Sequence, residues 1–171
     1  MVQVDAFEAV VTRIEVRDFS PKEVPNEVKM KVLEAGRMAP SAWNKQPWHF
    51  VLVDDKQELA KLASLSQTGG YIKGAAFAVA VLIDKSYPQY NTDAIRCVQG
   101  ILIAAWGLGL GSCFVGVIDR EKVKELLGAP PELHLVTILP FGYTRKTFKG
   151  KKDRKPLKDM ASHNRFGVPL E

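Results

Sequence analysis

The segment AAFAVAVLI at positions 75–83 constrains the fold more than any other part of the chain. It is almost wholly apolar, and its valine and isoleucine side chains favour extended backbone. A strand with one face in water alternates apolar and polar residues, whereas a strand covered on both faces is apolar throughout. We therefore expect a strand inside a sheet that is covered on both sides.

The rest of the chain alternates between helical and extended patterns. Helices are expected from about residue 5 to 13, from about 25 to 39, and over 56–66, 91–110 and 120–128, and further strands over 49–55, 112–117 and 133–143. This order predicts an α+β fold or a three-layer sandwich with four or five strands. The length of 171 residues and the absence of internal repeats favour a single domain over residues 1–171. From about Thr144 onward the chain is basic and extended, and no packed element is expected.

Local signals support several of these helix ends. Asp5 and Glu8 have the spacing of a capping box, Pro40 stops the second helix, and Asp119 and Gly128 begin and end the last one. The helix over 91–110 carries an unusually wide apolar surface, which is typical of a helix in a core or at a subunit interface.

The composition limits the kinds of partner and site. A net charge of +5 favours an anionic partner, such as a phosphate, a nucleic acid or an acidic membrane. The two cysteines, Cys97 and Cys113, lie in apolar contexts, which favours buried thiols, and no metal-ligand spacing is present. The N-terminal sequence lacks the pattern of a signal peptide, and no segment is long and apolar enough to predict a membrane span, so we expect a cytoplasmic protein.

Three polar clusters are candidates for a binding site. Arg13 and Arg17 are four residues apart, and paired guanidiniums suit a phosphate; the alternative is a solvated pair bridged to a neighbouring acid. The segment APSAWNKQPWHF, residues 39–50, combines small hydrogen-bonding groups with flat apolar ones; its alternative is a capped turn before a core tryptophan. The third cluster is the basic run Lys149, Lys151, Lys152, Arg154 and Lys155, which is either part of a site or a solvated tail.

A fourth motif, GLGLGS at 107–112, imitates a dinucleotide-binding loop. That loop must follow a strand and begin a helix, and here the order is the reverse. We expect a tight helix-to-strand turn with left-handed glycines instead.

Taken together, the clusters and their order resemble the nitroreductase family of FMN-dependent oxidoreductases from about Phe7 to Leu157. The matching segments are RIEVRDF (13–19), APSAWNKQPW (39–48), GLGSCFVG (109–116), ELLGAP (125–130), LPFGY (139–143) and KDRKPL (152–157). The first departs from the family pattern R-R-S-x-R-x-F, because Ile14 replaces an arginine and Glu15 replaces a serine. A carboxylate beside a phosphate is unfavourable unless an arginine neutralises it.

The resemblance implies a fold, an assembly and a cofactor. The fold is a nitroreductase-like three-layer sandwich with a mostly antiparallel sheet, in an intertwined homodimer that holds tightly bound FMN at its interface. The C-terminal part would close on the FMN phosphate and on the partner subunit. The implied cofactor-binding residues are Arg13, Glu15, Arg17, Pro40, Ser41, Asn44, Gln46, Gln67, Val115, Gly116, Lys152 and Arg154. Of these, Ser41 and Asn44 would come from the partner, and Val115 and Gly116 would approach the reactive nitrogen of the flavin.

The implied activity is a ping-pong transfer of hydride from NAD(P)H through FMN to an electron-poor small molecule, such as a nitroaromatic, a quinone or a flavin. No catalytic side chain is expected, because the flavin does the chemistry. One alternative is a specialised relative, either a dehalogenase or a flavin-cleaving enzyme, although the short segment 84–93 leaves little room for the lid that these require. A non-enzymatic FMN-binding protein and a basic nucleic-acid-binding protein are the two remaining possibilities.

Overall fold

The computed structural model describes residues 5–145 and 152–170. Its α-helices are α1 (Ala6–Thr12), α2 (Asn26–Arg37), α3 (Lys56–Ser64), α4 (Tyr90–Gly107) and α5 (Arg120–Leu126). Its strands are β1 (Trp48–Val53), β2 (Phe77–Asp84), β3 (Gly111–Ser112) and β4 (Leu133–Gly142), and short 3₁₀ turns lie at η1 (Ala42–Asn44), η2 (Gly70–Gly74) and η3 (Leu157–Asp159). None of the helices in the described ranges has the length and apolar character that a membrane crossing requires.

The four strands form one antiparallel sheet in the order β1-β2-β4-β3. The long strands β2 and β4 are central, and they pair along almost their whole length from Phe77 opposite Phe141 to Asp84 opposite Leu133. The expected α+β architecture with a mostly antiparallel sheet is confirmed.

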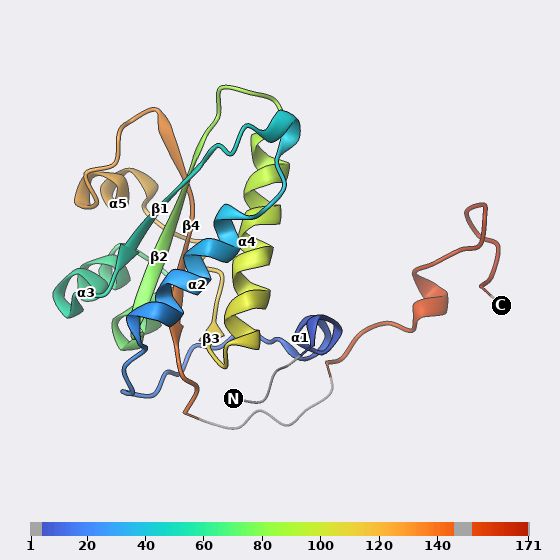
Figure 1. The fold of residues 1–171 in the computed structure, drawn as a ribbon, viewed down its shortest axis with the longest axis horizontal. Helices are drawn as coiled ribbons and strands as arrows, with labels where there is room; N and C mark the ends of the chain where they lie inside the picture. Colours follow the sequence, from blue (N-terminus) through green and yellow to red (C-terminus); the bar gives the residue numbers. More distant parts are fainter. Residues whose placement is uncertain (1–4, 146–151, 171) are drawn as a thin grey trace.

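Strand β2 is covered on both faces, as its composition predicts. Residues 77–83 are completely buried. Phe77, Val79 and Val81 pack with α2 and α4, whereas the alternating residues Ala78 and Ala80 pack with α3 and α5. Figure 1 shows α2 and α4 on one side of the sheet and α3 and α5 on the other. The alternation of side chains along an extended strand therefore divides the core into two layers.

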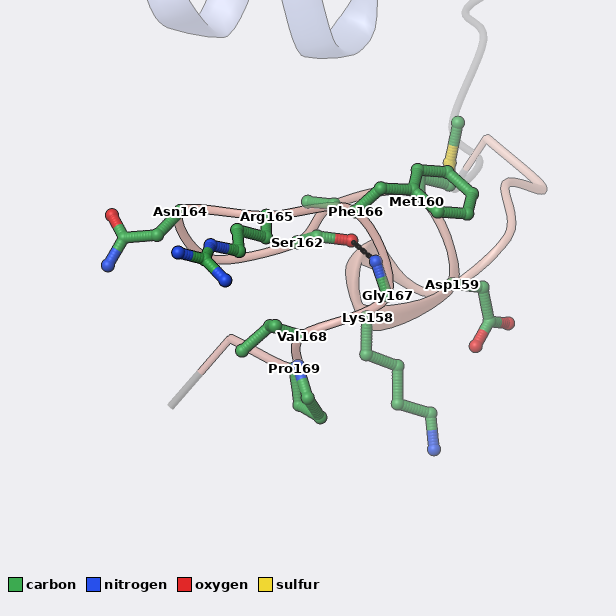
Figure 2. A pocket seen from close by; sticks show the side chains of 11 residues that line it. Lys158, Asp159, Met160, Ser162, Asn164, Arg165, Phe166, Gly167, Val168 and Pro169 are labelled. Carbon is green, nitrogen blue, oxygen red and sulfur yellow. Dashed lines mark hydrogen bonds between the residues drawn. The ribbon is translucent and has the colours of Figure 1, made fainter.

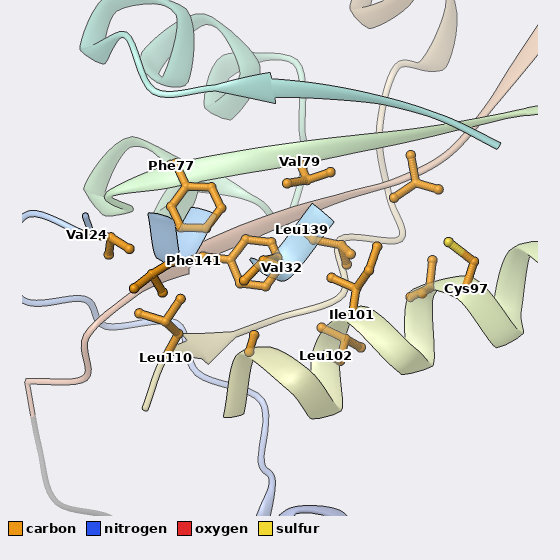
Figure 3. Packing of buried hydrophobic residues seen from close by; sticks show 14 residues of the cluster. Val24, Val32, Phe77, Val79, Cys97, Ile101, Leu102, Leu110, Leu139 and Phe141 are labelled. Atoms are coloured by element: carbon orange, nitrogen blue, oxygen red, sulfur yellow. The ribbon is translucent and has the colours of Figure 1, made fainter. Parts of the chain in front are cut away.

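The core between the sheet and α4 is closely packed. Phe77 and Phe141 stack with their ring centres 4.9 Å apart, and Ile101 and Leu102 of α4 lie against them (Figure 3). Gly36 of α2 faces α4 so closely that a Cβ atom there would lie 2.7 Å from Ile101. Glycine suits this position because any side chain there would have to displace the packed side chains of Ile101 and Phe50.

The predicted turn residues are found at the helix ends. Asp5 accepts a hydrogen bond from the amide of Glu8, and Asp119 accepts one from the amide of Lys122. At the end of α4, the amides of Gly109 and Leu110 donate to the carbonyls of Trp106 and Ala105 at 2.9 Å each. With Gly109 at φ +81°, this is a Schellman motif, so the segment GLGLGS is the predicted helix-to-strand turn.

The strand predicted over 112–117 is wrong for most of its length. Only Gly111 and Ser112 pair with β4, and Val115 makes a single further bridge to Ile138. The register Ser112–Phe141 places Cys113 opposite Pro140. The carbonyl of Phe141 accepts from Ala76 on the β2 side, so its neighbour Pro140 faces Cys113. Pro140 has no amide hydrogen to give, and the ladder ends there.

The described end of the chain, residues 152–170, projects from the body (Figure 1). It contains no packed helix or strand, as the sequence predicts, and it bends at η3 and again over residues 163–168, where the amide of His163 donates to the carbonyl of Val168. Its apolar side chains Leu157, Met160 and Phe166 are 70%, 67% and 104% exposed. The tail forms a hollow of its own, in which the amide of Gly167 donates to Ser162 Oγ at 3.0 Å (Figure 2). The residues that line this hollow all lie within 158–169, and none of the predicted site residues is among them.

Candidate functional site

The first predicted cluster lies where the chain leaves α1. Arg13 follows the last residue of α1, and its Nη2 contacts Glu15 Oε1 at 2.6 Å. The second carboxylate oxygen of Glu15 accepts the amide of Phe114 at 2.8 Å. The backbone of this segment is fixed beside β3, because the amide of Val16 donates to the carbonyl of Ser112 at 2.8 Å. Glu15 therefore joins the N-terminal segment to the loop after β3.

The carboxylate of Glu15 is held in its charged form. Burial by itself would raise its pKa, but hydrogen bonds from Arg13, Cys113 and the Phe114 amide, with the charge of Arg13, more than offset this. The net effect is a pKa of Glu15 below its ordinary value. The sequence left open whether Arg13 pairs with a neighbouring acid, and in the structure it pairs with Glu15. The other nearby acid, Asp18, pairs instead with Arg145 at 3.0 Å.

Arg17 lies on the other side of the same group of residues. Its guanidinium is 5.8 Å from the ring centre of Tyr71, and the Tyr71 hydroxyl is 3.2 Å from Cys113 Sγ. Burial raises the pKa of Cys113 to about 11 and that of Tyr71 to about 12, so both stay protonated at neutral pH. A protonated buried thiol is a poor nucleophile and a poor metal ligand, which leaves Cys113 a packing role.

Across residues 5–145 and 152–170, no three acidic, cysteine or histidine side chains gather in a way that would hold a metal ion.

Cations from the far end of the sequence reach the same place. Lys152 Nζ donates to the carbonyl of Val10 in α1 at 2.8 Å. Burial, and then the positive charges of Arg13 and Arg154, lower the pKa of Lys152. Arg154 uses one Nη atom to donate to the carbonyl of Asp153 at 2.6 Å. Lys149 and Lys151, predicted to share this basic run, lie outside the described residues. Lys152 is thus repelled by both arginines, and an anion bound beside it would relieve that repulsion.

The second predicted cluster, Pro40 to Gln46, is a tightly bent loop. Trp43, Asn44 and Gln46 have φ values of +50°, +55° and +48°, in the left-handed region that side-chain-bearing residues rarely adopt. Ser41 Oγ accepts the amide of Gln46 at 2.9 Å, and Gln46 Nε2 donates to the carbonyl of Asn44 at 3.1 Å. Within the described residues the side chain of Asn44 makes no hydrogen bond, and Trp43 is 72% exposed. The loop is thus held rigid while its polar and aromatic groups face outward.

A buried aspartate, which no sequence pattern singled out, holds this loop to α4. Asp93 is 1% exposed, and its Oδ2 accepts the amide of Ala42 at 2.9 Å and the hydroxyl of Tyr87 at 2.7 Å. Its other oxygen has no hydrogen-bond partner among the described residues. An acidic residue in the first turn of a helix usually serves the helix itself, so position alone does not reveal a contact 51 residues away.

The two clusters lie at opposite ends of α4 in one chain. The loop is attached at Asp93, near the start of the helix, whereas Trp106 near its end donates from Nε1 to Thr12 of α1 at 2.9 Å. Along the axis these two positions are about 20 Å apart, at roughly 1.5 Å per residue. Figure 1 shows α1 at one end of α4 and the turn η1 at the other. A single protomer therefore does not bring Ser41 and Asn44 to Arg13.

The remaining predicted residues lie around the loop after β3. Gln67 is exposed, and its amide donates to the carbonyl of Val117 at 3.1 Å, so it does lie beside this loop. The side chain of Val115 is fully buried, and its carbonyl accepts from Thr137 Oγ1 at 3.0 Å. Gly116 is exposed, and its carbonyl accepts from Arg120 Nη2 at 3.3 Å. Tyr71 and the Phe114 amide also belong to this group, although sequence patterns alone did not single them out.

Comparisons of the sequence and of the structure with known proteins all point to the nitroreductase family. The nitroreductase family model matches residues 10–89 and 72–143. An Archaeoglobus fulgidus protein, provisionally named NADH dehydrogenase/NAD(P)H nitroreductase, is 32% identical over 161 residues, which cover 88% of this chain and 92% of that protein. Two solved structures are similar over most of their length. One, from Parabacteroides distasonis and provisionally given the same name, has a TM-score of 0.86, 26% identity, and coverage of 94% of this chain and 98% of the other. The other, an FMN-dependent nitroreductase from Clostridium difficile, has a TM-score of 0.83, 26% identity, and coverage of 92% and 98%.

Proposed function

We propose that this chain, which belongs to the nitroreductase family, is an oxidoreductase that binds FMN and passes reducing equivalents from NAD(P)H to electron-poor small molecules. The observation that carries the proposal is the position of Lys152, which donates to the carbonyl of Val10 in α1 and is repelled by the charges of both Arg13 and Arg154. A site that gathers cations from both ends of a chain suits a phosphate group, which offers several anionic oxygens at once.

The donor set fits the phosphate end of FMN. Arg13, Lys152 and Arg154 supply positive charge, and Arg17 adds a further guanidinium on the Tyr71 side. Glu15 supplies a negative charge in contact with this group, and Arg13 already neutralises it. When bound, the flavin supplies the redox chemistry, accepting hydride from NAD(P)H and then reducing the acceptor in its turn, as a ping-pong scheme requires.

The ring end of the flavin would lie along the loop after β3. Gly116 is exposed and has no side chain, so its backbone can approach a flat ring closely, and Gln67 lies beside it. Val115 contributes backbone only, because its side chain fills the core. We assign no catalytic residue to these positions, since their tasks are to hold and orient the ring.

We propose a homodimer in which the loop from Pro40 to Gln46 completes the site of the partner. The separation of that loop from Arg13 along α4 supports this assignment, because one protomer cannot use both groups on one flavin. Exposed apolar side chains on α1 and the tail, such as Phe7 at 75% and Phe166 at 104%, also favour burial against a second copy. Ser41, Asn44 and Gln46 would then supply hydrogen-bonding groups to a ring or a polyol chain.

An open acceptor pocket is part of the proposal. Strand β2 ends at Asp84 and α4 begins at Tyr90, so the described residues 85–89 between them hold no helix that could form a lid. This supports a general reductase over a dehalogenase or flavin-cleaving enzyme, for which we expect extra covering residues. Crystals soaked with a nicotinamide analogue test the open pocket. A flavin face that is covered by protein in such crystals would contradict it.

The experiment that tests the function is spectroscopic. Purified protein, reconstituted with FMN if necessary, should be yellow, and NADH or NADPH should bleach it under anaerobic conditions. Addition of a nitroaromatic, a quinone or free flavin should restore the colour. Failure to bind FMN would overturn the proposal and favour a basic nucleic-acid-binding protein. FMN binding without bleaching by either donor would indicate a flavin carrier.

A further inference from the structure

Glu15 occupies the place of an anion within the cationic cluster. Its two carboxylate oxygens take a guanidinium N–H of Arg13 at 2.6 Å and the backbone amide of Phe114 at 2.8 Å. Proteins often bind phosphate oxygens with a guanidinium and a backbone amide that converge on one point in this way. In this chain an internal carboxylate already uses them.

The side chain is fixed in this position rather than loosely placed. The backbone on either side is docked, since Glu15 forms a bridge with Ser112 and Val16 donates to the same residue at 2.8 Å. Its side chain is 33% exposed and that of Arg13 only 17%, so solvent screens the pair less than an ordinary surface ion pair. The carboxylate therefore acts at short range on any anion that binds to Arg13.

We infer that Glu15 is an internal counter-ion that neutralises Arg13 and lowers the preference of the site for a flavin that carries a 5′-phosphate. The inference rests on the proposed function, because it needs the flavin phosphate to lie beside Arg13, Lys152 and Arg154. Glu15 sets the affinity for the phosphorylated cofactor: without its charge, the site would hold FMN more tightly and release it more slowly. It acts on binding, not on the redox step.

A purely structural role for Glu15 predicts a different result. If its carboxylate only anchored the Phe114 loop, its loss would weaken every flavin alike, with or without a phosphate. Glu15→Gln separates the two roles, because the amide keeps the size of the side chain and an oxygen for the Phe114 N–H but removes the charge. Riboflavin, which lacks the phosphate, is the matched ligand.

The test measures the dissociation constants of FMN and riboflavin for the apoprotein by quenching of flavin fluorescence. We expect Glu15→Gln to bind FMN at least about tenfold more tightly, because even under full screening by water a unit charge about 4 Å from a doubly charged phosphate has an effect of that order. It should bind riboflavin as the wild type does. Glu8→Gln, which removes an exposed acid from α1, is the charge control and should change neither constant. Unchanged or weaker FMN binding by Glu15→Gln, or equal changes for both flavins, would overturn the inference.

A charge-neutral pair keeps the inference testable if Glu15→Gln does not fold. Arg13→Gln alone leaves Glu15 uncompensated and should weaken FMN binding by at least about tenfold. The double variant Arg13→Gln/Glu15→Gln removes both charges and should recover to within about threefold of the wild type. No recovery would contradict the counter-ion role. A wild-type protein that binds no flavin at all would instead defeat the proposed function.

Discussion

Lys152 Nζ donates a hydrogen bond to the carbonyl oxygen of Val10 over 2.8 Å, and so ties the tail to the first helix across 142 positions of sequence. This contact places a tail cation near Arg13, and burial, followed by the positive charges of Arg13 and Arg154, lowers the pKa of Lys152. The phosphate site that we propose draws on both ends of the chain and depends on that tether, so it can be tested from the tail side without disturbing the core.

Lys152→Met should weaken FMN binding by roughly 1.5–3 kcal/mol, the scale of one charge-assisted hydrogen bond. Methionine keeps the apolar stem of the side chain but loses its charge and its donor. Fluorescence titration of the apoprotein with FMN measures the change. Lys158→Met, at an exposed lysine on the same tail, is the matched control and should bind FMN normally. Equal affinities for the two variants would remove Lys152 from the phosphate site.

Asn44→Gly should loosen the flavin or shift its reduction potential while leaving the protein folded. Glycine adopts the φ of +55° at this position without strain, so the substitution removes the side chain and keeps the loop. Since the Asn44 side chain makes no hydrogen bond among the described residues, its loss should leave the stability of the apoprotein nearly unchanged. Potentiometric titration and FMN affinity provide the readouts, with the exposed neighbour substitution Lys45→Gln as control. Normal values of both would exclude Asn44 from the site.

Much of the fold could be predicted because its signals are local. The apolar run of β2, the aspartate caps of α1 and α5, and Gly109 after α4 each determine their own neighbourhood. The strand predicted over 112–117 failed because its extent depends on the partner strand. Pro140 lies opposite Cys113 and lacks the amide hydrogen that would continue the ladder. The residues 112–117 by themselves carry no information about this partner.

The candidate site could be predicted only in part, for a similar reason. The arginine pair and the loop 39–50 are visible in the sequence, but the meeting of Arg13 with Lys152 was expected only from the family resemblance. Asp93 and Tyr71 were not predicted, because each acts through a partner far away in the sequence. Asp93 contacts Ala42, and Tyr71 contacts Cys113. Side chains that position a site through distant contacts leave no periodic or motif signal.

Asp93→Ala should destabilise the protein by roughly 2–4 kcal/mol, because it leaves the amide of Ala42 and the hydroxyl of Tyr87 without their shared acceptor in a buried place. Denaturant unfolding of the apoprotein gives the free energy. Tyr87→Phe removes only one donor and should lose roughly 1 kcal/mol, with the loop still held by Asp93. A loss for Asp93→Ala no larger than that for Tyr87→Phe would show that the Ala42 contact does not anchor the loop.

The stabilisation by Glu15 should disappear in acid. Its folded pKa lies below the ordinary value of 4.5, so its contribution is complete above that value and is lost as the pH falls through the lower, folded value. At pH 7, Glu15→Gln should therefore lower the free energy of unfolding of the apoprotein by roughly 1 kcal/mol, allowing for partial exposure. The difference from the wild type should shrink steadily at pH values below the ordinary one. Denaturant unfolding at a series of pH values checks this, with Glu8→Gln as the exposed control. A difference that persists unchanged into acid would mean that the ionised carboxylate is not what holds Arg13 to the Phe114 loop.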